Sequence, residues 1–123
     1  MPTAPIHNVP FDQLEIGMEA ARTRTLRAED LFIFANSSGN VNPMHLPDED
    51  GDGDGRPEAV APGMFVGSMV SAVLGNILPG AGTLYRSQHF DFHARAHAGE
   101  ELLSRVTVTG KDPATGCVTL ATE

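Results

Sequence analysis

Cysteine, basic residues and long apolar runs are all scarce in this sequence of 123 residues. The single cysteine, Cys117, excludes an internal disulfide, and the strand-like stretch around it, CVTLATE, predicts a buried structural thiol. Eight basic against 16 acidic residues give a net charge of −8, which disfavours nucleic acids and anionic membranes as partners. No apolar run approaches the roughly 18 residues of a membrane span, and the N-terminus lacks a signal-peptide pattern. We therefore expect a cytoplasmic protein with neither a nucleic-acid nor a membrane partner.

What the sequence does contain is one alternation of helical and strand-like segments, which predicts a single domain over residues 1–123. The helix of residues 63–78 is apolar around most of its circumference, so it should be buried on most sides by a sheet. The predicted fold class is α+β, with this long central helix wrapped by a curved antiparallel sheet. The chain ends inside an apparent strand, which favours a domain truncated at its C-terminus or a fragment of a longer polypeptide. The other expected elements are a strand over 17–26, a helix from Ala28 to about Asn36 capped by Thr25, and strands over 83–94, 101–110 and 117–123.

The segment NSSGNVNPMHL, residues 36–46, is a polar loop directly after an apolar run. Asn42-Pro43 disfavours helical backbone before the proline, and Gly39 permits a tight turn. Such a turn would hold residue 40 and His45 in fixed places. A neutral imidazole accepts or relays a proton near pH 7, so His45 is a candidate catalytic group.

The run DEDGDGDG resembles a calcium loop, with acids at positions 1, 3 and 5 when counted from Asp48. Position 12 should be a bidentate Glu, but it is Ala59, and Glu58 stands one residue early. We therefore expect a flexible acidic surface loop here, with a specific calcium site as the lesser alternative.

Three histidines, His89, His93 and His97, are spaced by four residues in a stretch that alternates like a strand. Four residues of strand span about 13 Å. Two such side chains cannot share a zinc ion, whose bonds are about 2 Å long. We expect no metal site and no cofactor in this protein.

The motif SGNVNPMH closely resembles the SGDxNPxH motif of the MaoC-like, R-specific enoyl-CoA hydratases, which have the hot-dog fold. The stretch GMFVGSMVSAVLGNILPGAGTLYRSQHFDF is similar to that family's central helix, its PG turn and the following strand. In all, residues 15–120 resemble the family, and most closely the hydratase-like domains found beside phosphate acyltransferases. The all-round apolar helix agrees with a hot-dog fold.

The resemblance implies reversible syn addition of water to a trans-2-enoyl-CoA, giving an R-3-hydroxyacyl-CoA. In this family an Asp and a His hold and activate the water, and His45 falls on that histidine. Gly63 matches the glycine at the helix start whose N–H polarises the thioester carbonyl, which agrees with the outward-pointing amides of a helix N-terminus. Ser71 matches a substrate-binding serine, with close helix packing as its alternative role, and Asn42 matches the structural Asn of the motif.

The resemblance also implies a second copy of the chain as partner and a basic entrance to the substrate pocket. Hot-dog domains commonly pair so that their sheets continue, so a homodimer is expected. The phosphates of CoA need basic side chains, and Arg86, Arg95 and Arg105 are candidates by charge alone.

Two residues depart from the family pattern. The catalytic aspartate is Asn40 here, and an amide cannot accept a proton from water at neutral pH. Losing one general acid–base group typically costs about 10²–10⁴-fold in rate. This fits an engineered inactive variant, a natural member of low activity, or a non-catalytic module that binds acyl-CoA thioesters; a hot-dog thioesterase is a further alternative. The second departure is Pro62, where the family has His, but the required donor belongs to Gly63.

Overall fold

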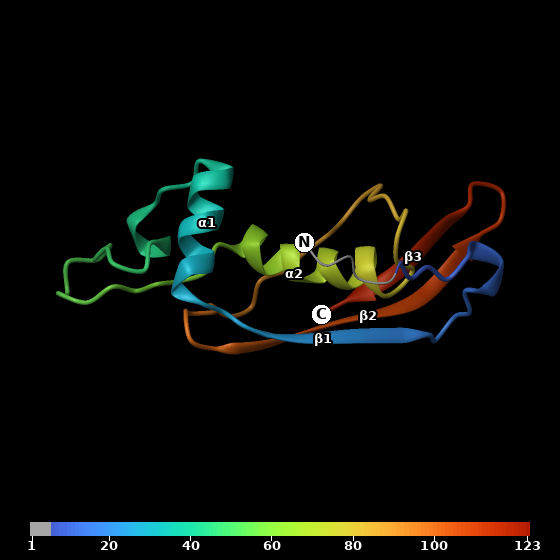
Figure 1. Ribbon diagram of the computed structural model, residues 1–123, viewed down its shortest axis with the longest axis horizontal. Coiled ribbons are helices and arrows are strands. Elements are labelled where there is room, and N and C mark those ends of the chain that lie inside the picture. The colour runs from blue at the N-terminus through green and yellow to red at the C-terminus, as the bar shows by residue number, and fades with distance from the viewer. Residues whose placement is uncertain (1–5) are drawn as a thin grey trace. The chain divides into compact units, whose positions relative to one another are not determined.

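The computed structural model describes residues 6–123, which form two compact units. The first unit comprises residues 6–22, 68–89 and 103–123, and the second comprises 23–67 and 90–102. Among the described residues, no helix is long and apolar enough to cross a membrane. The elements are η1 (Phe11–Gln13), β1 (Glu19–Thr25), α1 (Ala28–Ser38), η2 (Pro43–His45), α2 (Gly63–Asn76), β2 (Glu101–Asp112) and β3 (Cys117–Thr122), shown in Figure 1.

The strands form one sheet in the order β1–β2–β3. β2 and β3 are antiparallel, and their register runs from Val106 opposite Thr122 to Asp112 opposite Cys117, with an irregularity between Val108 and Gly110. These strands confirm the predicted strands over 101–110 and 117–123, and β1 confirms the strand over 17–26. In the first unit, the hairpin of β2 and β3 passes beside the C-terminal part of α2 (Figure 1).

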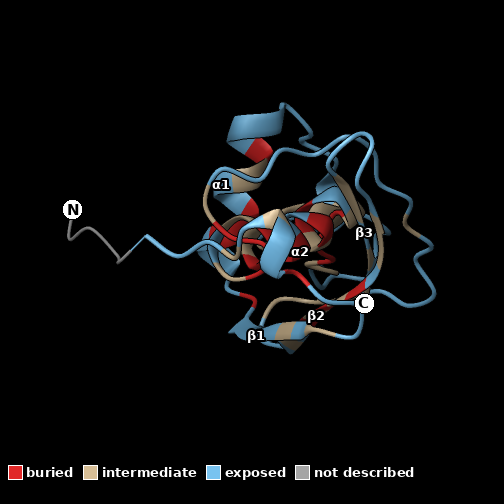
Figure 2. Ribbon diagram, turned by 90° about the vertical axis from the view of Figure 1, so that its right-hand side faces the viewer, coloured by how far each residue is buried: buried red, intermediate tan, exposed pale blue. Residues whose placement is uncertain are grey.

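Each unit has its own buried apolar cluster, and buried residues gather on α2 and β2 (Figure 2). In the first unit, the cluster joins one face of α2 to the inner face of β2; it consists of Leu14, Met69, Val70, Val73, Leu74, Leu78, Val106 and Val108. In the second unit, it joins α1 to the start of α2; it consists of Leu26, Leu31, Ala35, Val60, Ala61 and Phe65.

The helix α1 begins one residue after Arg27, whose N–H donates to Oδ2 of Asp30 at 3.0 Å. Oδ1 of Asp30 accepts from Arg24 at 2.7 Å, so this buried carboxylate is fully engaged. The expected cap, Thr25, is therefore wrong, because an acidic side chain inside the first turn satisfies the free amide instead. At the other end Gly39 takes a left-handed backbone, with φ of 79°, and closes the helix as expected.

The helix α2 is buried or half-buried on most sides, as predicted. One side is exposed: Met64 is 66% exposed, and Ser68 and Ser71 are exposed on the same side. The predicted strand over residues 83–94 is wrong, because these residues form no strand in the described part of the chain and most of them are exposed. The physical reason is that an extended segment becomes a strand only where its backbone has a partner to pair with.

Candidate active site

His45 ends η2, the short helical turn that follows Asn42 and Pro43. Oδ1 of Asn42 accepts the N–H of Met44 at 3.3 Å and so caps the turn, while Pro43 occupies its first position. The imidazole is half-buried, and its Nδ1 lies 2.7 Å from the carbonyl oxygen of Val60. The turn and this one contact fix the ring in place.

The partner of Nδ1 decides the tautomer of His45. A carbonyl oxygen only accepts hydrogen bonds, so Nδ1 must carry the proton and donate it to Val60. In the neutral ring Nε2 is then an acceptor. The ring is therefore arranged to take a proton from a water or hydroxyl on its Nε2 side.

Asn40 lies in the same turn and is exposed. Its backbone N–H donates to Oγ of Ser38 at 3.1 Å, and its Oδ1 accepts the N–H of Asn42 at 3.3 Å. The side-chain NH₂ has no hydrogen-bond partner within residues 6–123. At this position the amide offers a donor to a ligand, and its acceptor is already used by the backbone.

The N-terminus of α2 provides two free backbone donors. The carbonyl of Pro62 accepts from Phe65 and Val66, at 3.0 and 3.2 Å, which leaves the amides of Gly63 and Met64 without an acceptor in the described chain. The ring of Phe92 packs so closely on Gly63 that an added Cβ would lie 3.1 Å from it. Only glycine fits here without a shift of the ring.

Gly63 lies near His45 because both are tied to Val60. Val60 accepts the hydrogen bond of the imidazole and precedes Gly63 by three residues, so the Cα atoms of Val60 and Gly63 are at most roughly 11 Å apart. Asn40, Asn42, His45 and Gly63 all belong to the second unit. Ser71 belongs to the first unit, so its role in the same site stays a prediction.

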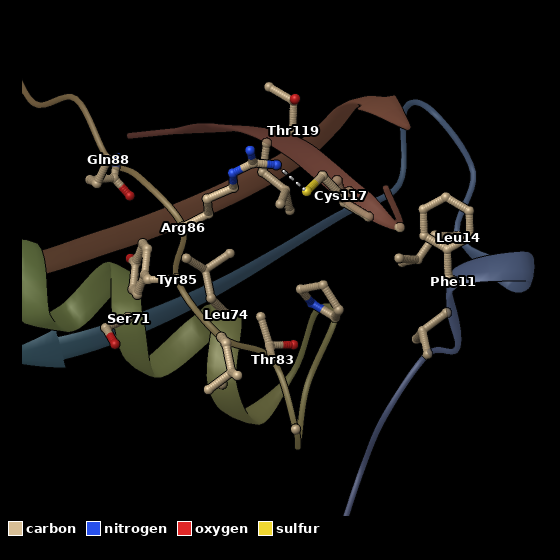
Figure 3. Close-up of a pocket in the computed structure, with 18 of the residues that line it drawn as sticks. Phe11, Leu14, Ser71, Leu74, Thr83, Tyr85, Arg86, Gln88, Cys117 and Thr119 are labelled. Carbon is tan, nitrogen blue, oxygen red and sulfur yellow. Dashed lines mark hydrogen bonds between the residues drawn. The ribbon is translucent and has the colours of Figure 1, made fainter. Parts of the chain in front are cut away.

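Ser71 lines an open pocket of about 1170 Å³ in the first unit (Figure 3). Leu74 and Tyr85 line its apolar side, and Arg86 reaches Cys117 with a hydrogen bond of 3.0 Å from Nη1 to Sγ. Cys117 is half-exposed rather than buried, so the expected structural thiol is wrong. The Thr115 hydroxyl, and after it the Arg86 guanidinium, hold the pKa of Cys117 below its ordinary value.

The other arginines proposed from charge have different surroundings. Arg105 donates to Oε1 of Glu123 at 2.9 Å, and this pair is exposed. Arg95 is exposed in the second unit. Of the three, Arg86 is the one that lines the pocket, and binding of CoA phosphates by any of them stays a prediction.

The acidic loop is ordered by its own backbone. Carboxylate oxygens of four acidic residues lie within 4.8 Å of one another, and Glu58, which the calcium template placed one residue early, is among them; the set is Asp50, Asp52, Asp54 and Glu58. Asp50 accepts the N–H groups of Gly53 and Gly55, at 2.7 and 2.6 Å, and the Gly55 amide is the main cause that lowers the pKa of its carboxyl. The loop's own amides therefore bind several of these oxygens, and the segment is an exposed surface loop, as predicted.

Comparison with known proteins identifies the family. The sequence pattern of the MaoC-like domain matches residues 12–122. An (R)-specific enoyl-CoA hydratase of Rhodospirillum rubrum is 33% identical over 112 residues, which cover 91% of this chain and 78% of that protein. A 3-hydroxybutyryl-CoA dehydratase of Methylorubrum extorquens is 32% identical over 98 residues, covering 80% of this chain and 62% of that one.

Solved structures agree with the sequence comparison. The unliganded R-hydratase PhaJ1 from Pseudomonas aeruginosa superposes with a TM-score of 0.80 at 29% identity, covering 95% of this chain and 83% of that one. The (R)-hydratase from Aeromonas caviae that is involved in PHA biosynthesis gives 0.71 at 26% identity, covering 89% and 92%. These similarities confirm the α+β hot-dog fold. The chain belongs to the MaoC-like domain family.

Proposed function

We propose that this protein is a hydro-lyase that adds water to trans-2-enoyl-CoA thioesters, giving R-3-hydroxyacyl-CoA. The observation that carries the proposal is the hydrogen bond from Nδ1 of His45 to Val60, because it leaves Nε2 as a proton acceptor. The hydratase names of the relatives support the substrate class.

In the proposed reaction, Nε2 of His45 takes a proton from a water molecule while the water oxygen bonds to the β-carbon of the enoyl group. The electron pair of the double bond moves onto the thioester oxygen, where negative charge develops. The amide of Gly63 at the start of α2 is a donor for that charge, and the positive end of the helix adds to its effect. Nε2 of His45 then gives this proton to the α-carbon while the electron pair moves back from the thioester oxygen, so that one water is added and the imidazole is neutral again.

Asn40 weakens this scheme. Its free NH₂ can donate to the water and hold it, but it cannot take the water's proton. An aspartate there would keep the hydrogen bond to the Asn42 amide with one oxygen and present the other to the water. We therefore propose that the chain hydrates slowly as it stands.

The test is hydration of crotonyl-CoA, followed by the loss of enoyl absorbance, in the protein and in Asn40→Asp. We expect the substitution to raise kcat by about 10²–10⁴-fold, because it adds a general base beside His45. Adding His45→Ala to Asn40→Asp should return the rate to background. Asn42→Asp is the matched control, since it adds a carboxylate two residues away and retains the cap on Met44.

If Asn40→Asp stays at background although it binds crotonyl-CoA in calorimetry, the proposed acid–base mechanism is wrong. Asn40 also favours a second function, a module that binds acyl-CoA thioesters without reacting them. Binding without turnover in every variant would support that module, and appreciable turnover by the unmodified chain would exclude it. Release of free CoA thiol would indicate a thioesterase instead.

We also propose that the protein is a homodimer. Residues 83–89 carry exposed apolar side chains, with Leu84 90% and Tyr85 49% exposed, on backbone that pairs with no strand in the described chain. Such an edge is a template for another strand, and a second copy would supply one.

A further inference from the structure

The backbone of residues 59–61 holds the imidazole of His45 and is itself held on both sides. The N–H of Val60 donates to the carbonyl of Met44 at 2.9 Å, and the carbonyl of Val60 accepts from His45 at 2.7 Å. On the opposite side, the N–H of Ala98 donates to Ala59 at 3.0 Å and the N–H of Ala61 to Ala96 at 2.8 Å. Val60 is buried, so this carbonyl is screened from competing water.

Ala59 has an unusual backbone within this frame. Its φ is +47°, and it is the one non-glycine residue with positive φ among those that the structure describes. A side chain disfavours this left-handed region, and a β-branched side chain does so strongly. Such a conformation persists only where the surroundings impose it, and such residues cluster at functional sites.

We propose that Ala59 is a positioning residue: its left-handed backbone aims the carbonyl of Val60 at Nδ1 of His45 and thereby keeps Nε2 as the proton acceptor. The inference rests on the proposed function for the meaning of Nε2. The tautomer it predicts is a property of the folded protein and does not depend on turnover.

The choice of a carbonyl as the partner has a chemical consequence. A carboxylate beside Nδ1 would add a negative charge to stabilise an imidazolium, whereas a carbonyl orients the ring and brings no net charge. The position of this one oxygen therefore decides which ring nitrogen faces the substrate. That position depends on the backbone at residue 59, and no side chain in the sequence marks it.

The experiment uses the full chain labelled with ¹⁵N, and reads the tautomer of His45 from the chemical shifts of its ring nitrogens. His45→Gln identifies the signals. In the unmodified protein we expect the neutral ring to carry its proton on Nδ1. A neutral ring protonated on Nε2 would overturn the proposal whether or not any variant folds.

Three substitutions then test residue 59. Ala59→Asn should retain the tautomer, because Asn tolerates the left-handed region, and Ala59→Gly should retain it as well. Ala59→Val should give a mixture of tautomers, because a β-branched residue cannot hold this backbone. Ala21→Val, on the exposed strand β1, is the control for adding the same side chain elsewhere, and it should change nothing.

Kinetics in the Asn40→Asp background separate this role from a general loss of stability. Ala59→Val should lower kcat by about 10²-fold, as expected for a catalytic group displaced by about 1 Å. KM should stay nearly constant in Ala59→Val, and Ala59→Asn should keep the kcat of the Asn40→Asp protein. A native tautomer and full kcat in Ala59→Val would overturn the positioning role. If no variant hydrates, the proposed function fails, and the tautomer measurement still decides the role of Ala59.

Discussion

At the scale of single residues, small differences in hydrogen-bonding capacity decide the chemistry. Asn40 and an aspartate would make the same bond to the Asn42 amide, and they differ at the second side-chain atom, where one donates and the other accepts. Likewise, the choice of Val60 carbonyl as the partner of His45 decides which nitrogen accepts a proton. Neither difference requires a change in the fold.

Cys117 provides a pH-dependent prediction at this scale. Because Thr115 and Arg86 lower the pKa of the thiol, the thiolate forms at lower pH than in a free cysteine. Alkylation by iodoacetamide should therefore reach its half-maximal rate below the ordinary value of 9.0, with the rate rising as pH rises through that point. The measurement is alkylation rate against pH, read by mass spectrometry.

Arg86→Gln should move this midpoint upward, since it removes the guanidinium that donates to Sγ. Arg105→Gln is the matched control, because Arg105 pairs with Glu123. Equal midpoints for all three proteins would contradict the assigned cause.

At the scale of elements, two glycines of α2 differ in whether packing requires them. An added Cβ at Gly67 would lie 2.7 Å from the ring of Phe90, which itself packs on Phe92 with ring centroids 5.6 Å apart. At Gly75 an added Cβ would meet no atom within 4 Å. Close packing therefore requires glycine at position 67 and leaves position 75 free.

Alanine substitution should separate the two positions. Gly75→Ala should raise the free energy of unfolding by up to about 1 kcal/mol, because alanine favours helix over glycine. Gly67→Ala has the same helical gain but must displace Phe90, so we expect it to be about 1–3 kcal/mol less stable than Gly75→Ala. Urea denaturation followed by circular dichroism measures both. Equal stabilities would mean that the Phe90 ring yields without cost.

At the scale of the whole molecule, the exposed segment of residues 83–89 predicts self-association. Light scattering after size exclusion should give about twice the chain mass of 13.0 kDa. Leu84→Asp should shift the protein toward monomer, because a charge would be buried where the strands pair. Ile16→Asp, at another exposed apolar position, should leave the mass unchanged. A monomer at micromolar concentration would contradict the proposed dimer.

Local patterns predicted most of the elements. Apolar spacing predicted α1, α2, β2 and β3 within a few residues, since these segments bury one face whichever partner covers it. The motif around Pro43 predicted a fixed turn, and the structure contains one, capped by Asn42. The strand over residues 83–94 was predicted wrongly. Alternating apolar and polar residues show that a segment can form a strand, but they do not show whether another strand lies beside it to pair with.

The candidate site was predictable in its side chains and unpredictable in its backbone. Asn40, His45 and Gly63 stand out in the sequence, and the structure ties Asn40 to the turn that ends at His45. Ala59 and Val60 gave no signal, because an alanine carries no mark of positive φ and every residue has a carbonyl. Glu58 was set aside because a linear template counts positions, whereas a folded loop brings carboxylates together by distance.

Residue types and their spacing were sufficient for the family and for most of the elements, and they named the candidate reacting groups, because these depend on composition along the chain. The orientation of His45, the free face of α2 and the exposure of Cys117 depend on which distant segments meet. Backbone hydrogen bonds and close packing determine those features, and both act between residues that are distant in the sequence.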